Sequence, residues 1–186
     1  MKKITYILLI SLLSTSLVLA QDKAKTPIDL LKKIHKYASK KEYDKLKPYL
    51  YQGVVTNGPT KEITGKTMAE IIIKGMKEGN MGSDFSFNAD ALQTIIDKHG
   101  DRLIPIPEKL RSRLFGENSS TFSQFKDLKQ IADNTPNDVY IFEYGGVRML
   151  MAKMNKGFRL VFWEGLKYFG KKENGNSTEP SKGGGK

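Results

Sequence analysis

Residues 138–164, DVYIFEYGGVRMLMAKMNKGFRLVFWE, decide the fold, because they combine three apolar runs with two short turns. The runs are rich in β-branched and aromatic residues, which is typical of β-strands. Gly145-Gly146 is typical of a two-residue hairpin turn, and Asn155-Lys156-Gly157 of a three-residue loop with glycine in the left-handed conformation. The stretch therefore predicts an antiparallel sheet with strands over 138–144, 147–154 and 158–164.

The two turns predict which residues of neighbouring strands lie opposite each other. The first pairs Tyr144 with Val147, and the second pairs Met154 with Phe158. Because side chains alternate between the faces of a strand, this register divides the strand residues into two apolar faces. One predicted face holds Val139, Ile141, Leu150, Ala152, Met154, Phe158, Leu160 and Phe162. The other holds Tyr140, Phe142, Tyr144, Met149, Met151, Val161 and Trp163, with Lys153 and Arg159 at its end.

Opposite charges meet at one end of the predicted sheet. The register places Glu143 and Glu164 on either side of Arg148, and a slip of one residue would separate them. A carboxylate can transfer protons when burial raises its pKa, so both glutamates are weak candidates for catalysis. An arginine between two carboxylates has, in general, the reverse effect and keeps the acids ionised. We therefore expect the trio to be a structural ion-pair cluster.

The second predicted face is dense in aromatic and methionine side chains, which are enriched at interfaces and in adaptable pockets. An apolar face of this kind has to be covered. The cover can be the middle helices of the chain, a second subunit in a homodimer formed through the sheet, or a ligand. The candidate binding residues on this face are Trp163, Met149, Phe142, Tyr140 and Met151.

Helical patterns fill the chain before this sheet. Thr26 suits a helix cap, Pro27 suits the first helical position, and apolar residues recur at helical spacing as far as Ala38. A short helix from Glu42, limited by Pro48, follows. Further helices are expected over 67–77, 88–99, 108–115 and 121–132, a strand from Val54 that turns at Asn57-Gly58-Pro59, and an extended stretch over 104–107. The predicted fold class is α+β, with N-terminal and middle helices packed on a C-terminal antiparallel sheet.

The N-terminal residues have the three parts of a secretory signal peptide. Lys2-Lys3 is a basic start, 4–13 is an apolar run, and Val18-Leu19-Ala20 supplies short residues that a signal peptidase reads. The apolar stretch is shorter than the ~20 residues that a membrane-spanning helix needs. We expect cleavage after Ala20 and export to the periplasm or the medium. The predicted organisation is a signal peptide over 1–20, a single α+β domain over 21–170 and a disordered tail over 171–186.

Composition narrows the chemistry. The chain has no cysteine, which excludes cysteine nucleophiles, thiolate metal sites and thiol redox chemistry. It has no histidine pair at metal-ligand spacing, no calcium loop, no phosphate-binding loop and no dinucleotide glycine motif, so we expect no metal and no cofactor. The formal charge of +11 becomes +9 once Lys2 and Lys3 leave with the signal peptide, which has no acid. That charge favours anionic partners, although lysines and acids are interleaved along the chain.

His99 is a further weak candidate for catalysis. Asp97 and Asp101 lie two residues away on either side, and a general base oriented by a carboxylate uses these residue types. A histidine in the last turn of a helix that Gly100 ends also interacts favourably with the helix dipole. We expect the helix-end role.

Three segments resemble the nuclear transport factor 2-like superfamily, a group of cone-shaped, cystatin-like α+β domains. They are YASKKEYDKLKPYL at 37–50, ITGKTM at 63–68 and FWE at 162–164. The resemblance covers about half of the chain, and the helical stretch 84–134 departs from the family, which has more strand there. It implies a helix packed in a curved sheet. The family includes isomerases, dehydratases and non-catalytic binding domains, so fold alone decides little about function.

The sequence favours a non-enzymatic, exported domain that binds a small apolar or amphipathic ligand or a protein partner. One alternative is an isomerase or hydrolase that uses an acidic residue in the cone. A second alternative is a polyanion-binding envelope protein, which a one-sided lysine patch would favour. We expect no nucleic acid partner and no transmembrane segment after signal cleavage.

Export is directly testable. Protein recovered from the envelope or medium of its source cell should have an intact mass that begins at Gln21, because the peptidase reads the residues that end at Ala20. Intact-mass spectrometry of both fractions checks this. Recovery of the full-length chain from the cytosol alone would contradict the prediction.

Overall fold

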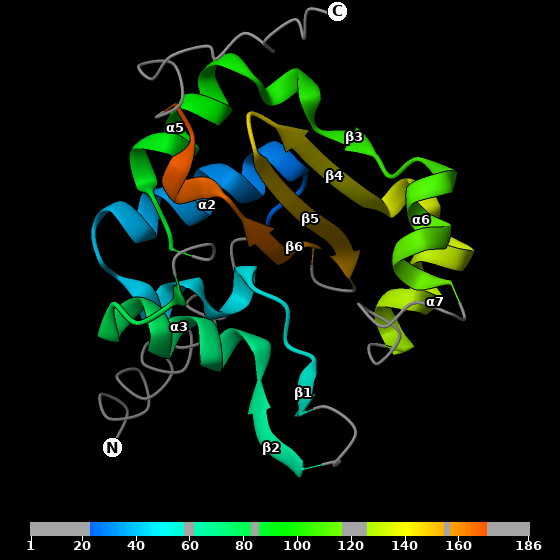
Figure 1. The fold of residues 1–186 in the computed structure, drawn as a ribbon, viewed down its shortest axis with the longest axis horizontal. Coiled ribbons are helices and arrows are strands. Elements are labelled where there is room, and N and C mark those ends of the chain that lie inside the picture. The colour runs from blue at the N-terminus through cyan, green and yellow to red at the C-terminus, as the bar shows by residue number, and fades with distance from the viewer. Residues whose placement is uncertain (1–22, 58–61, 83–85, 117–125, 155–156, 171–186) are drawn as a thin grey trace, which may run out of the picture.

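The computed structural model describes residues 23–57, 62–82, 86–116, 126–154 and 157–170, and it has the α+β architecture that the sequence predicts. Most of the described helices precede residue 139, and three of the four strands of an antiparallel sheet follow them (Figure 1). The α-helices are α2 (Pro27–Ser39), α3 (Met68–Glu78), α5 (Ala89–Lys98), α6 (Glu108–Phe115) and α7 (Lys126–Asn134). Short 3₁₀ helices are η1 (Tyr43–Tyr49), η2 (Gly100–Arg102), η3 (Pro136–Asp138) and η4 (Leu166–Tyr168).

The helix starts follow the capping residues in the sequence. The Thr26 side chain accepts a hydrogen bond from the Asp29 backbone at the start of α2, and Pro27 is its first residue. Asn88 caps α5 in the same way. At α3 the Thr67 side chain and the Glu70 carboxylate each accept a backbone N–H from the other residue, which forms a complete capping box. These caps satisfy donors that the first turn of a helix leaves without a partner.

The main sheet has four strands in the order β3-β4-β5-β6. Its strands are β3 (Ile104–Pro105), β4 (Val139–Tyr144), β5 (Val147–Met154) and β6 (Gly157–Glu164). The predicted hairpin turn is confirmed, since Gly145 and Gly146 have φ of 59° and 77°, values that favour glycine. The extended stretch from Ile104 supplies the edge strand β3, which pairs with β4.

A second sheet of two strands contains β1 (Val54–Asn57) and β2 (Glu62–Thr67). The sequence pattern predicts β1 but not β2. Ile63 is the one large apolar residue of β2, so this segment lacks the apolar alternation by which a strand is recognised.

The register of the main sheet is confirmed at one end and wrong at the other. Glu143 pairs with Arg148, and Arg148 pairs with Glu164, as predicted. Between Leu150 and Met151 the pairing of β5 with β6 shifts, because Val161 is an extra residue on β6. Beyond that β-bulge Met154 pairs with Gly157 and not with the predicted Phe158.

The bulge changes which face four residues occupy, because one extra residue reverses the alternation of the strand beyond it. Phe158 and Leu160 pack with Met149, Met151 and Trp163, and not on the predicted Val139 face. Val161 packs with Val139, Leu150 and Ala152 instead of with Trp163. Arg159 now pairs with Ala152, so it lies on the face opposite to the predicted one.

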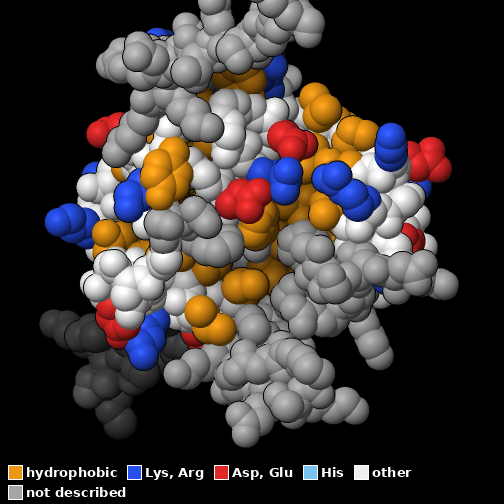
Figure 2. Space-filling model, in the orientation of Figure 1, with side chains coloured by type: hydrophobic (Ala, Val, Ile, Leu, Met, Phe, Trp, Pro, Cys, Tyr) orange, Lys and Arg blue, Asp and Glu red, His pale blue; other side chains and the backbone are white. Residues whose placement is uncertain are grey.

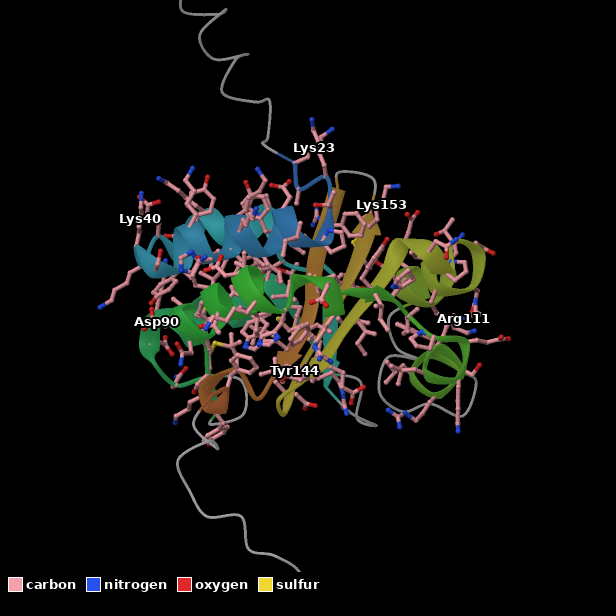
Figure 3. The ribbon with its side chains drawn as sticks, turned by 90° about the horizontal axis from the view of Figure 1, so that it is seen from above. Lys23, Lys40, Asp90, Arg111, Tyr144 and Lys153 are labelled. Atoms are coloured by element: carbon pink, nitrogen blue, oxygen red, sulfur yellow. The ribbon has the colours of Figure 1, made fainter. Side chains whose placement is uncertain are left out.

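Each face of the sheet is covered by helices of the same chain, one group on either side of the strands in Figure 3. On the Trp163 face the cover comes from α2, α3 and α5, through buried residues such as Leu30, Ile72 and Leu92. On the Val139 face it comes from α6 and α7, through Phe115, Leu128 and Ala132. The sheet is therefore an internal layer between two hydrophobic cores.

The free edge of β6 is also partly occupied. The Tyr51 backbone N–H donates to the Leu160 carbonyl at 2.9 Å, and the Phe158 N–H donates to the Ala24 carbonyl at 2.9 Å. These contacts tie the segments before α2 and after η1 to the sheet, and they satisfy backbone groups that an edge strand would otherwise expose.

Several predicted features fall outside the described residues. They are the signal peptide over 1–20, the tail over 171–186, the turn at Gly58-Pro59, the loop at Asn155-Lys156 and the predicted helix start over 121–125. In the part of the chain that the structure describes, no helix is long and apolar enough to cross a membrane.

Burial of Trp163 gives a test of the two-core arrangement. Trp163→Ala should lower the free energy of unfolding by ~3–5 kcal/mol, as large-to-small aromatic changes in cores do. The wild-type emission should be short in wavelength, and it reports on this site alone because the chain has one tryptophan. Urea denaturation followed by fluorescence and circular dichroism measures both quantities. As a control, Tyr168→Ala at an exposed position should change stability by less than ~0.5 kcal/mol. A loss below ~1 kcal/mol for Trp163→Ala would contradict the fold.

Candidate functional site

The Glu143–Arg148–Glu164 trio forms at the turn end of the sheet. Arg148 Nη2 lies 2.9 Å from Glu143 Oε1, and Arg148 Nη1 lies 3.0 Å from Glu164 Oε1. The Arg148 side chain is 36% exposed and that of Glu143 is 53% exposed. The hydrogen bond that Arg148 donates to Glu143 raises the pKa of Arg148, against a smaller opposite effect of burial. Each acid is therefore held by a permanent cation in contact with solvent.

This arrangement is suited to holding neighbouring strands together and not to moving protons. A general acid or base has to reach the reacting proton, whereas each of these carboxylates is bound to the Arg148 guanidinium. Acidic and basic side chains also lie against one another near the centre of the face in Figure 2. Glu143 and Glu164 thus form, with Arg148, the ion-pair cluster that the register predicted.

His99 lies at the end of α5, where its backbone N–H donates to the Ile95 carbonyl. Its ring lies 4.6 Å from the ring of Tyr144 and 5.9 Å from that of Phe169, measured between centroids. The Arg102 guanidinium covers the Tyr144 ring at 4.0 Å. No metal-ligand cluster of histidine and acidic residues occurs among the described residues. His99 is therefore an aromatic packing residue at a helix end.

The candidate binding residues of the Trp163 face lie in the interior. Phe142, Met149, Met151 and Trp163 are at most 3% exposed, and helices of the same chain cover them. Tyr140 is half-buried, with its ring edge-on to Phe158. The cover is the internal one that the sequence left as an alternative, so neither a ligand nor a second subunit is needed to shield this face.

A hollow opens instead on the other side of the sheet, where α7 and η3 pass the ends of β5 and β6. Its volume is about 830 Å³. The α7 residues on its wall are spaced so that they share one helix face. The lining residues are Asp127, Gln130, Ile131, Asn134, Thr135, Asp138, Lys153, Met154 and Arg159.

Arg159 is the distinctive residue of this hollow. Its Nε is buried and has no hydrogen-bond partner among the described residues, and its Nη1 donates to the Leu50 carbonyl at the long distance of 3.5 Å. No ion pair joins it to a carboxylate of the described residues, and burial is the one influence on its pKa. Burial lowers the pKa of the Arg159 guanidinium, but arginine remains charged in proteins. The wall of the hollow thus holds a partly desolvated cation without a counter-charge from the described part of the chain.

The two acids on the wall already have partners. The Tyr51 hydroxyl donates to Asp127 Oδ1 at 2.5 Å, and burial, followed by this hydrogen bond, raises the pKa of Tyr51. Lys153 Nζ lies 3.2 Å from Asp138 Oδ1. Among the charged groups on this wall, Arg159 is therefore the one without a partner of opposite charge in the described part of the chain.

Sequence reasoning missed this site. It placed Arg159 on the opposite face, because it did not include the bulge at Val161. The segment that forms α7 was predicted only as a helix that covers one face of the sheet. A charged residue in the apolar strand FRLVFW was the one available signal, since charges in such strands need a partner or an open edge.

No family model, curated protein or solved structure matches this chain in comparisons with known proteins. The nuclear transport factor 2-like resemblance therefore stays a prediction from its three segments.

The exposure of the trio predicts a small effect of Arg148→Ala. The free energy of unfolding should fall by less than ~1 kcal/mol, because ion pairs in contact with solvent contribute little and are screened by salt. Urea denaturation at low and at 1 M NaCl measures this, and the difference between the two proteins should shrink at high salt. A loss above ~2 kcal/mol that salt leaves unchanged would show that the trio is buried.

Proposed function

We propose that this protein is an exported, non-enzymatic domain that binds a small amphipathic molecule with an anionic group in the hollow beside α7. The observation that carries the proposal is Arg159 on the wall of this hollow, a partly desolvated cation whose buried Nε has no acceptor among the described residues. The basic start, apolar run and short-residue exit of the first twenty residues support the export part of the proposal.

The surroundings of Arg159 support an anionic ligand, because they leave a buried hydrogen-bond donor of its guanidinium without an acceptor. A buried donor without an acceptor costs roughly 1–3 kcal/mol, and such groups in a native structure call for an explanation. An anionic ligand would supply the missing counter-charge. Arginine presents its donors in a planar fork that matches a carboxylate with two parallel hydrogen bonds, so a carboxylate is the simplest such group.

The remaining lining supports an amphipathic ligand of modest size. Ile131 and Met154 supply apolar surface, and Gln130, Asn134 and Thr135 supply polar groups. The volume of about 830 Å³ lies in the ~300–1,000 Å³ range of small-molecule sites. Methionine also adapts its shape to different ligands.

The contacts of the acids favour binding over catalysis. Asp127 accepts from Tyr51, and Asp138 is paired with Lys153, so neither acid is a free general base on this wall. No cofactor is needed for this proposal.

A ligand series can test the proposal without knowledge of the natural ligand. Butanoate, hexanoate and octanoate should raise the melting temperature of the chain from Gln21, and the corresponding neutral amides should not. At ten times its Kd a ligand adds about 1.4 kcal/mol, which is ~3–6 °C for a domain of this size. Differential scanning fluorimetry measures the shift for each pair of compounds.

Substitution of the key residue separates binding from folding. Arg159→Met should remove the acid-dependent shift, and it should leave the free protein as stable as wild type or more stable by ~1 kcal/mol, because the unsatisfied donor is gone. Arg113→Met, the same change at an exposed position outside the hollow, should keep the shift. Equal shifts with acids and amides, no shift with any acid, or a shift that persists in Arg159→Met would each reject the proposal.

A further inference from the structure

Residues 23–41 carry a concentration of positive charge that is independent of the hollow. This stretch has seven lysines and one acid, Asp29, which gives it a net charge of +6 out of +11 for the whole chain. Lys33 is half-buried and pairs with Asp29 at 3.7 Å. The other six lysines are exposed: Lys23, Lys25, Lys32, Lys36, Lys40 and Lys41, here called the α2 lysines.

The α2 lysines differ in their ion pairing from the lysines of several other elements. None of the six side chains has an ion pair with a carboxylate within the described ranges, whereas lysines on several other elements do. The paired lysines are Lys45 with Glu42, Lys47 with Glu70, Lys77 with Asp44, Lys129 with Asp133, and Lys153 with Asp138. The α2 lysines thus form a concentration of positive charge that no ion pair of the described residues neutralises.

The helix geometry aligns this charge on one face. Lys32, Lys36 and Lys40 are spaced by four residues, so they form a row of about 12 Å along the outer side of α2. The inner side of α2 is buried in the core through residues such as Leu30 and Ile34. Lys23 and Lys40, near the two ends of the α2 lysines, point to the same side of the molecule in Figure 3, opposite Tyr144.

Such a row is unfavourable for the free protein. Like charges four residues apart destabilise a helix by roughly as much as opposite charges stabilise it. Acids at these positions would remove the repulsion, as they do for Lys74 with Glu78 on α3. An external anionic partner would remove it as well.

We propose that the face made by the α2 lysines binds an anionic lipid surface through its headgroups. A helix face is convex, so it presents its charges to a flat array of anions better than to a single chain that needs a groove. Tyr37, half-buried and stacked on Tyr49 at 5.8 Å, lies beside Lys36 and Lys45. A tyrosine has the apolar body and polar tip that suit the interface of a membrane with water.

Vesicle binding tests this surface directly. The chain from Gln21 to Lys186 should sediment with vesicles of phosphatidylcholine and phosphatidylglycerol in equal parts, and not with vesicles of phosphatidylcholine alone. Binding should weaken strongly as ionic strength rises from 0.01 M to 0.15 M, because the Debye length falls from ~30 Å to ~8 Å. Each lysine near an anionic surface contributes roughly a fivefold increase in partition coefficient.

A matched pair of triple variants separates the α2 face from total charge. Lys32→Gln, Lys36→Gln and Lys40→Gln together should lower the partition coefficient by about 100-fold. Lys98→Gln, Lys109→Gln and Lys167→Gln together remove the same charge from exposed lysines on α5, α6 and η4, and should lower it by less than about tenfold. Circular dichroism should show both variants folded.

Three results would overturn the proposal. One is equal loss of binding in the two triple variants. The second is failure of the wild type to bind the anionic vesicles, or equal binding to neutral ones. The third is α2-dependent binding to heparin, a soluble polyanion, without binding to vesicles, which would assign the face to a polyanionic chain.

Discussion

The arrangement of the sheet depends on Val161. It is the extra residue of β6 at the bulge, where two residues of β6 lie opposite one residue of β5. The strand before it would otherwise place Phe158 and Leu160 on the Val139 face. With Val161 accommodated as a bulge, both residues join Trp163 under α2 and α5, and Val161 itself joins the core under α6 and α7. Apolar burial stabilises at roughly 25 cal/mol per Å², so filling both faces is the dominant favourable contribution to this fold. Hydrogen bonds from Tyr51 and to Ala24 then hold the bulged strand at its outer edge.

The same bulge determines which residues of the sheet a ligand can reach. With both sheet faces filled, the aromatic and methionine residues contribute to stability and lie out of reach of ligands in the free protein. Beyond the bulge Arg159 faces the α7 side, where the cover ends and a hollow remains. The result is a cation at the end of an apolar layer, which suits recognition of an anionic group attached to an apolar body. The α2 lysines lie on an outer helix face, so the proposed attachment to a lipid surface and the proposed ligand binding use separate parts of the molecule.

Much of the fold could be predicted because its signals are local. Capping residues such as Thr26 and Asn88 marked helix starts, and the Gly145-Gly146 turn with its flanking charges predicted the pairing of Glu143 with Arg148. The bulge could not be predicted, because it depends on how both faces of the sheet pack against helices that are distant in the sequence. That single omission also misplaced Arg159, so the candidate site escaped prediction while the ion-pair trio did not. β2 was missed for the opposite reason: its segment has too few apolar residues to carry a strand pattern.

The pairing of β5 with β6 is the most direct test of this account. Interstrand nuclear Overhauser contacts in isotope-labelled protein should pair Met149 with Trp163 on one side of the bulge, and Met151 with Leu160 on the other. Arg159 should then show contacts to Ala152 across the strands. Contacts that pair Ala152 with Leu160 without interruption would mean that β6 has no bulge. Arg159 would then lie on the Trp163 face, and the site beside α7 would lose its cation.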